Sequence, residues 1–349
     1  MTITTTCIGA YPKPDYVEIG NFVETGAPDD GATRAFSYTQ DSAAEVPEEL
    51  LLRATAAAIR DQLDCGIDIP TDGEQRRENY IHYHCRHLDG IDFVNLTNRV
   101  HRNGAAVADL PTIHAAIKPR GDHFLDRDFR SAQDFSARPV KITVPGPLSI
   151  MDTTANRHYG SDQELAFDLA DALNFEIRAL AAAGCKYIQL DEPLFVRKVE
   201  DALAYGVECL DRCFDGVPAD VTRVMHMCCG YPGHLDDADY LKADPDGYQR
   251  LARAIDRSSV HQVSIEDAHC LNDLMLLEEF SNTAIILGVV TIASSHIESI
   301  DAIEQRLRLA LQHIDNERLL AAPDCGLMML GRSLAMAKLK NMCAAAARI

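Results

Sequence analysis

The sequence lacks several features that would place it in whole classes of protein. No stretch approaches the ~20 consecutive apolar residues that a helix needs to cross a bilayer, so we expect no membrane-spanning segment. The N-terminus has no basic region followed by a long apolar run, which predicts no secretory signal and a cytoplasmic location. Basic residues are scarce relative to acidic ones, 33 against 53, and the net charge of −20 argues against general binding to nucleic acid or anionic lipid.

Cysteine is too infrequent for a disulfide-bonded scaffold. Eleven of the 349 residues are cysteine, well below the ~8–10% typical of such scaffolds. Without an export signal we expect reduced thiols. Most should be small buried hydrophobic residues, so the question is which of them have a chemical role.

Short apolar or β-branched runs alternate with longer segments of helical periodicity. The runs predict strands at Ile3–Ile8, Gly66–Thr71, Val140–Val144, Tyr187–Asp191, Thr222–Met227, Gln262–Glu266, Ile285–Val290 and Leu319–Pro323. The segments between them predict helices at Pro47–Cys65, Asp162–Gly184, Val199–Phe214, Gly247–Arg257, Asn272–Phe280, Ser299–Ile314 and Ser333–Arg348. This alternation is typical of a parallel sheet covered on its outside. Eight strands in this pattern predict an α/β fold, a (β/α)8 TIM barrel.

Two segments interrupt the alternation. Residues Tyr11–Glu45 are rich in Gly, Pro, Asp and Thr and predict an extended loop after the first strand. Residues Asn79–Arg138 are long and polar, and we interpret them as an insertion after the second strand, over the barrel mouth. Because no predicted strand or helix holds His82 and His84, we expect solvated or ion-paired side chains there. No repeat or linker divides the chain, so residues 1–349 are expected to form one domain.

Reactive side chains gather where the predicted strands end, and in such barrels that edge carries the active site. His226 and Cys228 are separated by one residue, so on an extended strand end both side chains leave the same face. Cys325 follows the last strand and can converge on them. Imidazole and thiolate are ligands that zinc takes, and catalytic zinc keeps three protein ligands plus a displaceable position. We therefore predict a zinc site at His226, Cys228 and Cys325.

The fourth ligand is expected to be Glu266, which ends the sixth strand. Asp267, His269 and Cys270 are eligible alternatives close by. An oxygen ligand is more easily displaced by an incoming thiolate than a cysteine would be. Zinc lowers the pKa of a bound thiol and holds it as the nucleophile that alkyl transfer requires. Cys229 points to the opposite face from Cys228 and is expected to be packed.

Carboxylates at the same edge have two interpretations. Glu74, Asp191 and Glu192 can bind a substrate ammonium or transfer protons. Alternatively they form structural ion pairs with neighbouring arginines such as Arg77. We favour the substrate role for Glu74 and Asp191, and regard the two interpretations of Glu192 as balanced.

A series of segments in order along the chain resembles one family. TTCIGAYPKP, DGEQ, VPGP, QLDEP, HMCC, SIED and PDCG are similar to segments of the catalytic barrel of the cobalamin-independent methionine synthases. The resemblance covers almost the whole chain. It implies a TIM barrel, a catalytic zinc, and methyl transfer to the sulfur of homocysteine to form methionine. The zinc ligands would be His226, Cys228, Glu266 and Cys325, and the residues around the amino acid would be Ile8, Gly9, Ala10, Glu74, Asp191 and Glu192, with Glu74 and Asp191 on its ammonium.

Departures from the family pattern concern mainly the methyl donor. Ala10 lies in the segment where the family usually has a serine that contacts the amino acid. In GVVTIAS, which resembles a G-V-x-D-x-H-S pattern, Thr291 replaces the aspartate and Ala293 the histidine. The family histidine is associated with the proton needed when a methyl leaves a folate nitrogen, and such general acid catalysis is worth ~10²–10⁴-fold. His296 is a candidate substitute.

The donor is therefore left open among methylfolate, a methylcorrinoid protein, a sulfonium and an epoxide. The single barrel also lacks the N-terminal barrel that long family members use for polyglutamylated folate. In the related epoxyalkane:coenzyme M transferases the thiol carries a sulfonate, and Arg77 and Arg120 would then matter more than the carboxylates. A third alternative is a uroporphyrinogen-decarboxylase-like barrel that binds a tetrapyrrole without zinc. The sequence makes no prediction about oligomeric state.

Overall fold

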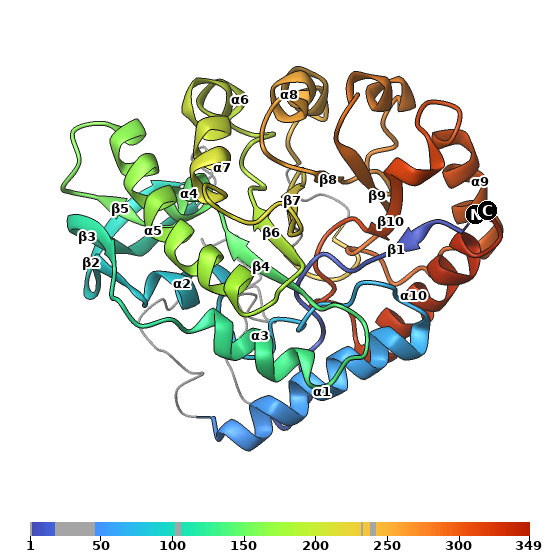
Figure 1. Ribbon diagram of the computed structural model, residues 1–349, viewed down its shortest axis with the longest axis horizontal. Coiled ribbons are helices and arrows are strands. Elements are labelled where there is room, and N and C mark those ends of the chain that lie inside the picture. The colour runs from blue at the N-terminus through green and yellow to red at the C-terminus, as the bar shows by residue number, and fades with distance from the viewer. Residues whose placement is uncertain (1, 18–45, 102–105, 232, 238–241) are drawn as a thin grey trace.

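Parallel strands form a curled sheet at the centre of the molecule (Figure 1). The structure, a computed structural model, describes residues 2–17, 46–101, 106–231, 233–237 and 242–349. The strand order is β1-β10-β9-β8-β7-β6-β4, and every neighbouring pair is parallel. The strands are β1 (Thr4–Thr5), β4 (Lys141–Pro145), β6 (Tyr187–Asp191), β7 (Thr222–Met227), β8 (Gln262–Ile265), β9 (Ala284–Val290) and β10 (Leu319–Pro323).

A short eighth segment closes the sheet between β1 and β4. Thr6 pairs with Ile69 and Thr71 pairs with Lys141, both in parallel, as single bridges. The predicted second strand is therefore present only as these bridges. With this closure the fold is the predicted (β/α)8 barrel.

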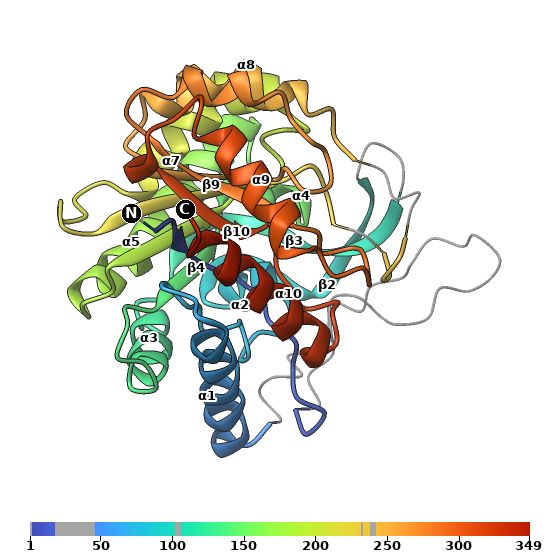
Figure 2. The ribbon, with the colours of Figure 1, turned by 90° about the vertical axis from the view of Figure 1, so that its right-hand side faces the viewer.

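Helices surround the barrel on its outside (Figures 1 and 2). They are α1 (Glu48–Cys65), α3 (Leu125–Gln133), α5 (Asp162–Ala182), α6 (Val199–Asp201), α7 (Val207–Cys213), α8 (Asp246–Asp256), α9 (Ile300–Ala310) and α10 (Arg332–Ala346). A π-helical turn, η3 (Ala202–Gly206), joins α6 to α7. The segment expected as a helix at Asn272–Phe280 contains instead a 3₁₀ helix, η4 (Leu274–Glu279). Among the described helices, none is both long enough and apolar enough to span a bilayer.

The longest of these helices illustrates how the sequence sets an element. The Ser161 side chain caps α5 by accepting a hydrogen bond from the backbone N–H of Glu164, and Asp162 adds a negative charge to the first turn. Leu165, Leu169 and other apolar residues three and four positions apart form the buried stripe that faces the barrel.

The barrel interior has its own apolar layer. Ile8, Ile69, Val224, Ile286, Leu320 and Ala322 form a cluster separate from the main core. Val224 lies two residues before His226, so both side chains leave β7 on the same face. The cluster therefore supports the site at the carboxyl ends of the strands from beneath.

The segment 79–138 contains regular structure. It begins with α2 (Tyr80–Cys85), followed by an antiparallel hairpin of β2 (Leu88–His101) and β3 (Ala106–Pro119), beside which β5 (Ala155–Asn156) pairs with β3. The hairpin lies to one side of the barrel (Figure 2), and α3 then packs against α1 and α5. Most of the loop expected at Tyr11–Glu45 lies outside the described residues.

The expectation that His82 and His84 are solvated was wrong. Asn79 caps α2 by accepting hydrogen bonds from the backbone N–H groups of residues 81 and 82, and the helix packs against β4 and the short helix α4 (Pro147–Asp152). Both imidazoles are buried. His82 Nε2 lies 3.2 Å from the Thr153 carbonyl oxygen, and His84 Nδ1 lies 2.8 Å from that of Tyr80. Burial lowers the pKa of both histidines, so they are neutral packing groups.

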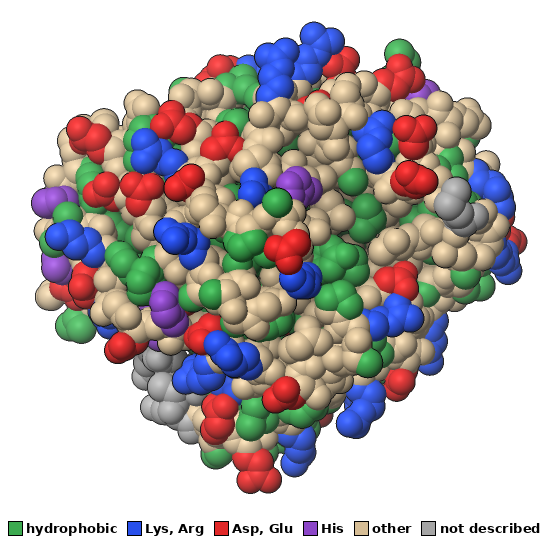
Figure 3. All heavy atoms as spheres, in the orientation of Figure 1, with side chains coloured by type: hydrophobic (Ala, Val, Ile, Leu, Met, Phe, Trp, Pro, Cys, Tyr) green, Lys and Arg blue, Asp and Glu red, His purple; other side chains and the backbone are tan. Residues whose placement is uncertain are grey.

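Charged side chains of both signs are interspersed on the face shown in Figure 3. Acidic side chains lie among lysines and arginines there, with no broad basic area on that face.

Candidate active site

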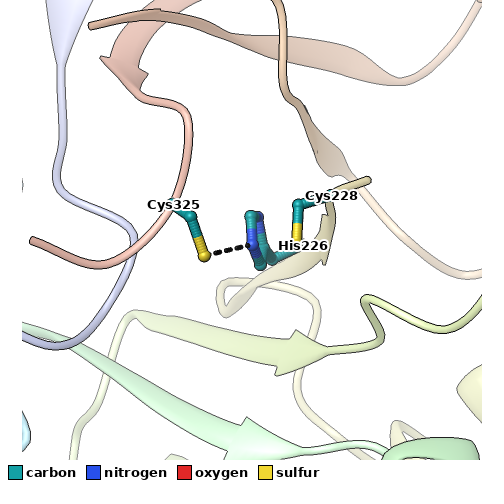
Figure 4. A group of neighbouring side chains, drawn as sticks. All are labelled: His226, Cys228 and Cys325. Carbon is teal, nitrogen blue, oxygen red and sulfur yellow. Dashed lines mark hydrogen bonds between the residues drawn. The ribbon is translucent and has the colours of Figure 1, made fainter. Parts of the chain in front are cut away.

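His226, Cys228 and Cys325 meet at the carboxyl ends of the barrel strands (Figure 4). Their potential ligand atoms all lie within 4.8 Å of one another, and His226 Nε2 is 3.3 Å from Cys325 Sγ. A hydrogen bond of 2.9 Å joins His226 Nδ1 to Ser264 Oγ on β8 and orients the ring so that Nε2 faces the thiols. The structure thus brings together the three side chains predicted as metal ligands, called the triad below.

Cys228 is buried and Cys325 is half-buried, and a hydrogen bond joins their side chains. The hydrogen bond from Cys325, assisted by His226, lowers the pKa of Cys228. The same hydrogen bond and burial raise the pKa of Cys325. A buried imidazole beside a thiol and a thiolate is a donor set that fits zinc, because zinc takes nitrogen and sulfur ligands and binds thiols in the deprotonated form.

Glu266 lies beside the triad, but its carboxylate has other partners. Oε1 accepts hydrogen bonds from Lys242 Nζ at 2.6 Å and from Cys270 Sγ at 3.4 Å. Oε2 accepts one from the backbone N–H of Cys229 at 2.9 Å. Among the described residues, Glu266 groups with Cys229 and Cys270, and with His269 and Asp324, rather than with the triad.

The neighbours of Glu266 are held by partners of their own. Asp267 forms two hydrogen bonds with the Arg306 guanidinium, at 2.6 and 2.7 Å. Asp324 accepts from the backbone N–H groups of residues 267 to 269 at 2.9–3.0 Å, and also from His269 Nδ1. These contacts fix the loop that follows β8. His269 Nε2 in turn accepts from the backbone N–H of Ala293 at 3.3 Å, so an imidazole lies against the position where the family pattern has a histidine.

A cavity of about 210 Å³ opens beside the triad. All three triad residues contribute to its wall, together with five of the residues predicted to contact substrate, namely Ile8, Gly9, Ala10, Glu74 and Asp191. Tyr80 and Tyr231 also line it, and sequence reasoning did not single them out. Both come from segments outside the strands, where no periodicity indicates which side chains reach the site.

Glu74 and Asp191 are buried carboxylates on the cavity wall. Glu74 Oε1 accepts from Thr143 Oγ1 at 2.7 Å and lies 3.6 Å from the Arg77 guanidinium, and burial raises the Glu74 pKa. Asp191 Oδ1 accepts from Gln189 Nε2 at 2.7 Å. Burial raises the pKa of Asp191 to about 7, although the neighbouring His226 opposes the shift.

Asp191 has no lysine or arginine nitrogen within 4.0 Å among the residues that the structure describes. Glu74, by contrast, has two cations beside it: the Arg77 guanidinium and Lys13, whose Nζ donates to the Glu74 backbone carbonyl at 2.8 Å. Because Asp191 is buried without such a partner, its position favours a ligand that brings a positive charge.

Glu192 has a different environment from that of Asp191, the residue before it. It is buried, and its carboxylate accepts from Leu148 N at 2.9 Å, Ser149 N at 3.1 Å and Ser149 Oγ at 2.9 Å, at the start of α4. A Cβ at Gly146 would lie 2.2 Å from the Glu192 carboxyl carbon, so only glycine permits this approach. Burial raises the pKa of Glu192 to about 8, against these hydrogen bonds. These hydrogen bonds connect the start of α4 to the end of β6, which is a structural role for Glu192.

The whole chain is similar to known proteins. A family model described as "Cobalamin-independent synthase, Catalytic domain" matches residues 2–348. A methionine synthase of Thermococcus kodakarensis is 30% identical over 350 residues, covering 97% of this chain and 91% of that protein. One from Sulfolobus acidocaldarius is 29% identical over 341 residues, covering 97% and 90%. The structure of a B12-independent methionine synthase from Shewanella sp. W3-18-1, in complex with selenomethionine, has a TM-score of 0.85 and 26% identity and covers 99% of this chain and 97% of that chain.

Proposed function

Because the chain belongs to the family of cobalamin-independent synthases, which makes it a methyltransferase, we propose that it methylates the thiol of homocysteine to form methionine. One observation carries this proposal: the triad and the two buried carboxylates Glu74 and Asp191 share the wall of one cavity. An amino acid with a thiol needs a group that activates its sulfur and a negative charge for its ammonium. We also propose that residues 1–349 act as a single domain.

We propose that the triad holds a zinc ion, with Glu266 as the fourth ligand. A bound zinc supplies a Lewis acid that lowers the pKa of a substrate thiol and keeps it as a thiolate at neutral pH. Ser264 holds the His226 ring in the orientation that a ligand needs. Glu266 already lies beside Cys229, the residue after Cys228, through its bond to the backbone N–H.

The carboxylates of Asp191 and Glu74 would bind the ammonium of homocysteine. Burial disfavours their ionised forms, and an ammonium between them would favour ionisation by bringing a positive charge, above all to Asp191. Ile8, Gly9 and Ala10 line the cavity beside them and would contact the rest of the amino acid. The selenomethionine bound to the Shewanella protein supports this, because it is the selenium counterpart of the proposed product.

Methylfolate is the donor that the family implies, and neither Thr291 nor Ala293 supplies the acid that it needs. Thr291 Oγ1 donates to Glu298 Oε1 at 2.6 Å, and Ala293 has no titratable group. His296, the candidate substitute, is exposed and does not line the cavity. A donor with a better leaving group would remove the need for this acid.

The test is an activity panel on zinc-loaded protein. Homocysteine is combined in turn with methyltetrahydrofolate carrying one or three glutamates, with methylcobalamin and with a sulfonium donor, and methionine is measured by mass spectrometry. We expect methionine from at least one donor, and loss of activity in the Asp191→Asn variant. Methionine from none of them, or equal turnover with coenzyme M in place of homocysteine, would overturn the proposal.

A further inference from the structure

Lys242 is the counter-ion of Glu266, and nothing in the proposed reaction so far uses it. Its Nζ donates to Glu266 Oε1 at 2.6 Å and lies 3.6 Å from Cys270 Sγ. The side chain of Glu266 is only 2% exposed, whereas that of Lys242 is 25% exposed. With the Cys229 N–H on its other oxygen, the Glu266 carboxylate is well satisfied while it is turned away from the triad.

A buried carboxylate needs a cation. Besides His269, whose Nδ1 lies 3.7 Å from Glu266 Oε1, two cations can pair with this carboxylate. One is a metal at the triad, because Glu266 Oε2 accepts a hydrogen bond at 2.9 Å from the backbone N–H of Cys229, the residue after Cys228. The other is the ammonium of Lys242. Leaving a buried charge without any partner is strongly unfavourable, whereas exchanging one cation for another changes the free energy far less. A ligand that must be displaced from a metal therefore benefits from a second cation beside it.

We propose that Lys242 receives the Glu266 carboxylate when the homocysteine thiol takes the fourth position on the zinc. This inference rests on the proposed zinc site. In the exchange, the Glu266 carboxylate would leave the fourth position to the substrate sulfur, and the thiol proton would be released to solvent. The displaced Glu266 carboxylate would then pair with Lys242. Lys242 is thus a positioning residue that sets how readily the fourth ligand leaves.

The test compares Lys242→Met, which keeps the length of the side chain and removes its charge, with Lys242→Arg and with Lys186→Met. Lys186 is half-exposed and pairs with Asp220, so its substitution serves as the matched control. Zinc affinity is measured by competition with a chelator. Homocysteine binding is measured on cobalt-substituted protein, in which each added thiolate ligand increases the thiolate-to-cobalt charge-transfer absorption.

We expect Lys242→Met to bind zinc more tightly, because the lysine no longer competes for Glu266. It should bind homocysteine about tenfold more weakly, because the displaced carboxylate has lost its lysine partner. Lys242→Arg should restore the wild-type values, and Lys186→Met should not change them. If wild-type protein binds zinc and homocysteine adds a thiolate ligand, but Lys242→Met does the same with unchanged affinities, this inference is wrong while the zinc site stands. If wild-type protein binds no metal at the triad, the proposed function itself fails.

Discussion

Asp191 is buried, accepts a hydrogen bond from Gln189, and has no basic side chain within 4.0 Å among the described residues. Burial raises its pKa from 3.8 to about 7. The folded protein therefore holds this proton more tightly than the unfolded chain does. The stability contributed by the protonated form is complete below about pH 4 and is lost as the pH rises through about 7.

The magnitude follows from the size of the shift. Each pKa unit corresponds to about 1.4 kcal/mol, so a shift of roughly three units is worth at most about 4 kcal/mol. Between pH 5 and pH 7.5 the expected loss is about 2–3 kcal/mol. In the Asp191→Asn variant the side chain stays neutral, so this loss should be absent. The variant should thus be more stable than wild type near pH 7.5, and the difference should shrink toward pH 5.

The assay is urea unfolding of metal-free protein at half-unit intervals from pH 5 to pH 8. Taking the difference between wild type and variant cancels the titration of groups common to both. Asp315→Asn is the control, because the side chain of Asp315 is 86% exposed, and its difference from wild type should stay flat. A variant less stable than wild type at pH 7.5, or a difference that does not change with pH, would refute the reasoning. The same variant should lose homocysteine binding. The buried Asp191 carboxylate that would pair with the substrate ammonium also lowers the stability of the protein while no ligand is bound.

Three further substitutions or additions test other parts of the site. Gly9→Ala would place a Cβ 2.5 Å from Glu74 Oε1 and displace that carboxylate. We therefore expect the KM for homocysteine to rise about tenfold in steady-state assays. An unchanged KM would contradict the role of Glu74. Lys338→Met removes a fully buried ammonium that donates to Glu298 and to the Thr291 carbonyl. It should lower the free energy of unfolding by about 3–5 kcal/mol. The control Lys340→Met, at an exposed position, should change it by less than about 0.5 kcal/mol. Zinc at 100 times its Kd should stabilise the protein by about 2.7 kcal/mol, measured as a rise in Tm. That rise should vanish in Cys228→Ser and Cys325→Ser and persist in Cys229→Ser; zinc stabilisation that survives in the first two variants would exclude the triad as the site.

Much of the barrel could be predicted from the chain because its strands are short, largely apolar runs. Tyr187–Asp191, Thr222–Met227 and Leu319–Pro323 have the same bounds in the structure as in the prediction. Such continuous runs stand out against the helical periodicity between them. The triad was predictable for a related reason: the period of two along β7 and the shared edge of parallel strands are both local properties. Its binding of zinc stays a prediction.

Side-chain contacts with segments distant in the chain could not be predicted from the sequence and are seen only in the folded protein. The burial of His82 and His84 depends on how α2 packs, and the polar sequence around them gave the opposite expectation. Glu192 was left balanced because its ligands, the backbone N–H groups at the start of α4, lie more than forty residues away in the chain.

The clearest contrast is between His226 and Glu266. The chain alone indicated that both lie at the carboxyl edge of the barrel, because His226 is near the end of one predicted strand and Glu266 ends another. That Glu266 meets Lys242 is visible only in the folded chain, where the segment between β7 and α8 brings the lysine to the carboxylate. A buried carboxylate pairs with the groups that lie about 3 Å from its oxygens. Strand periodicity does not specify which loop atoms come that close.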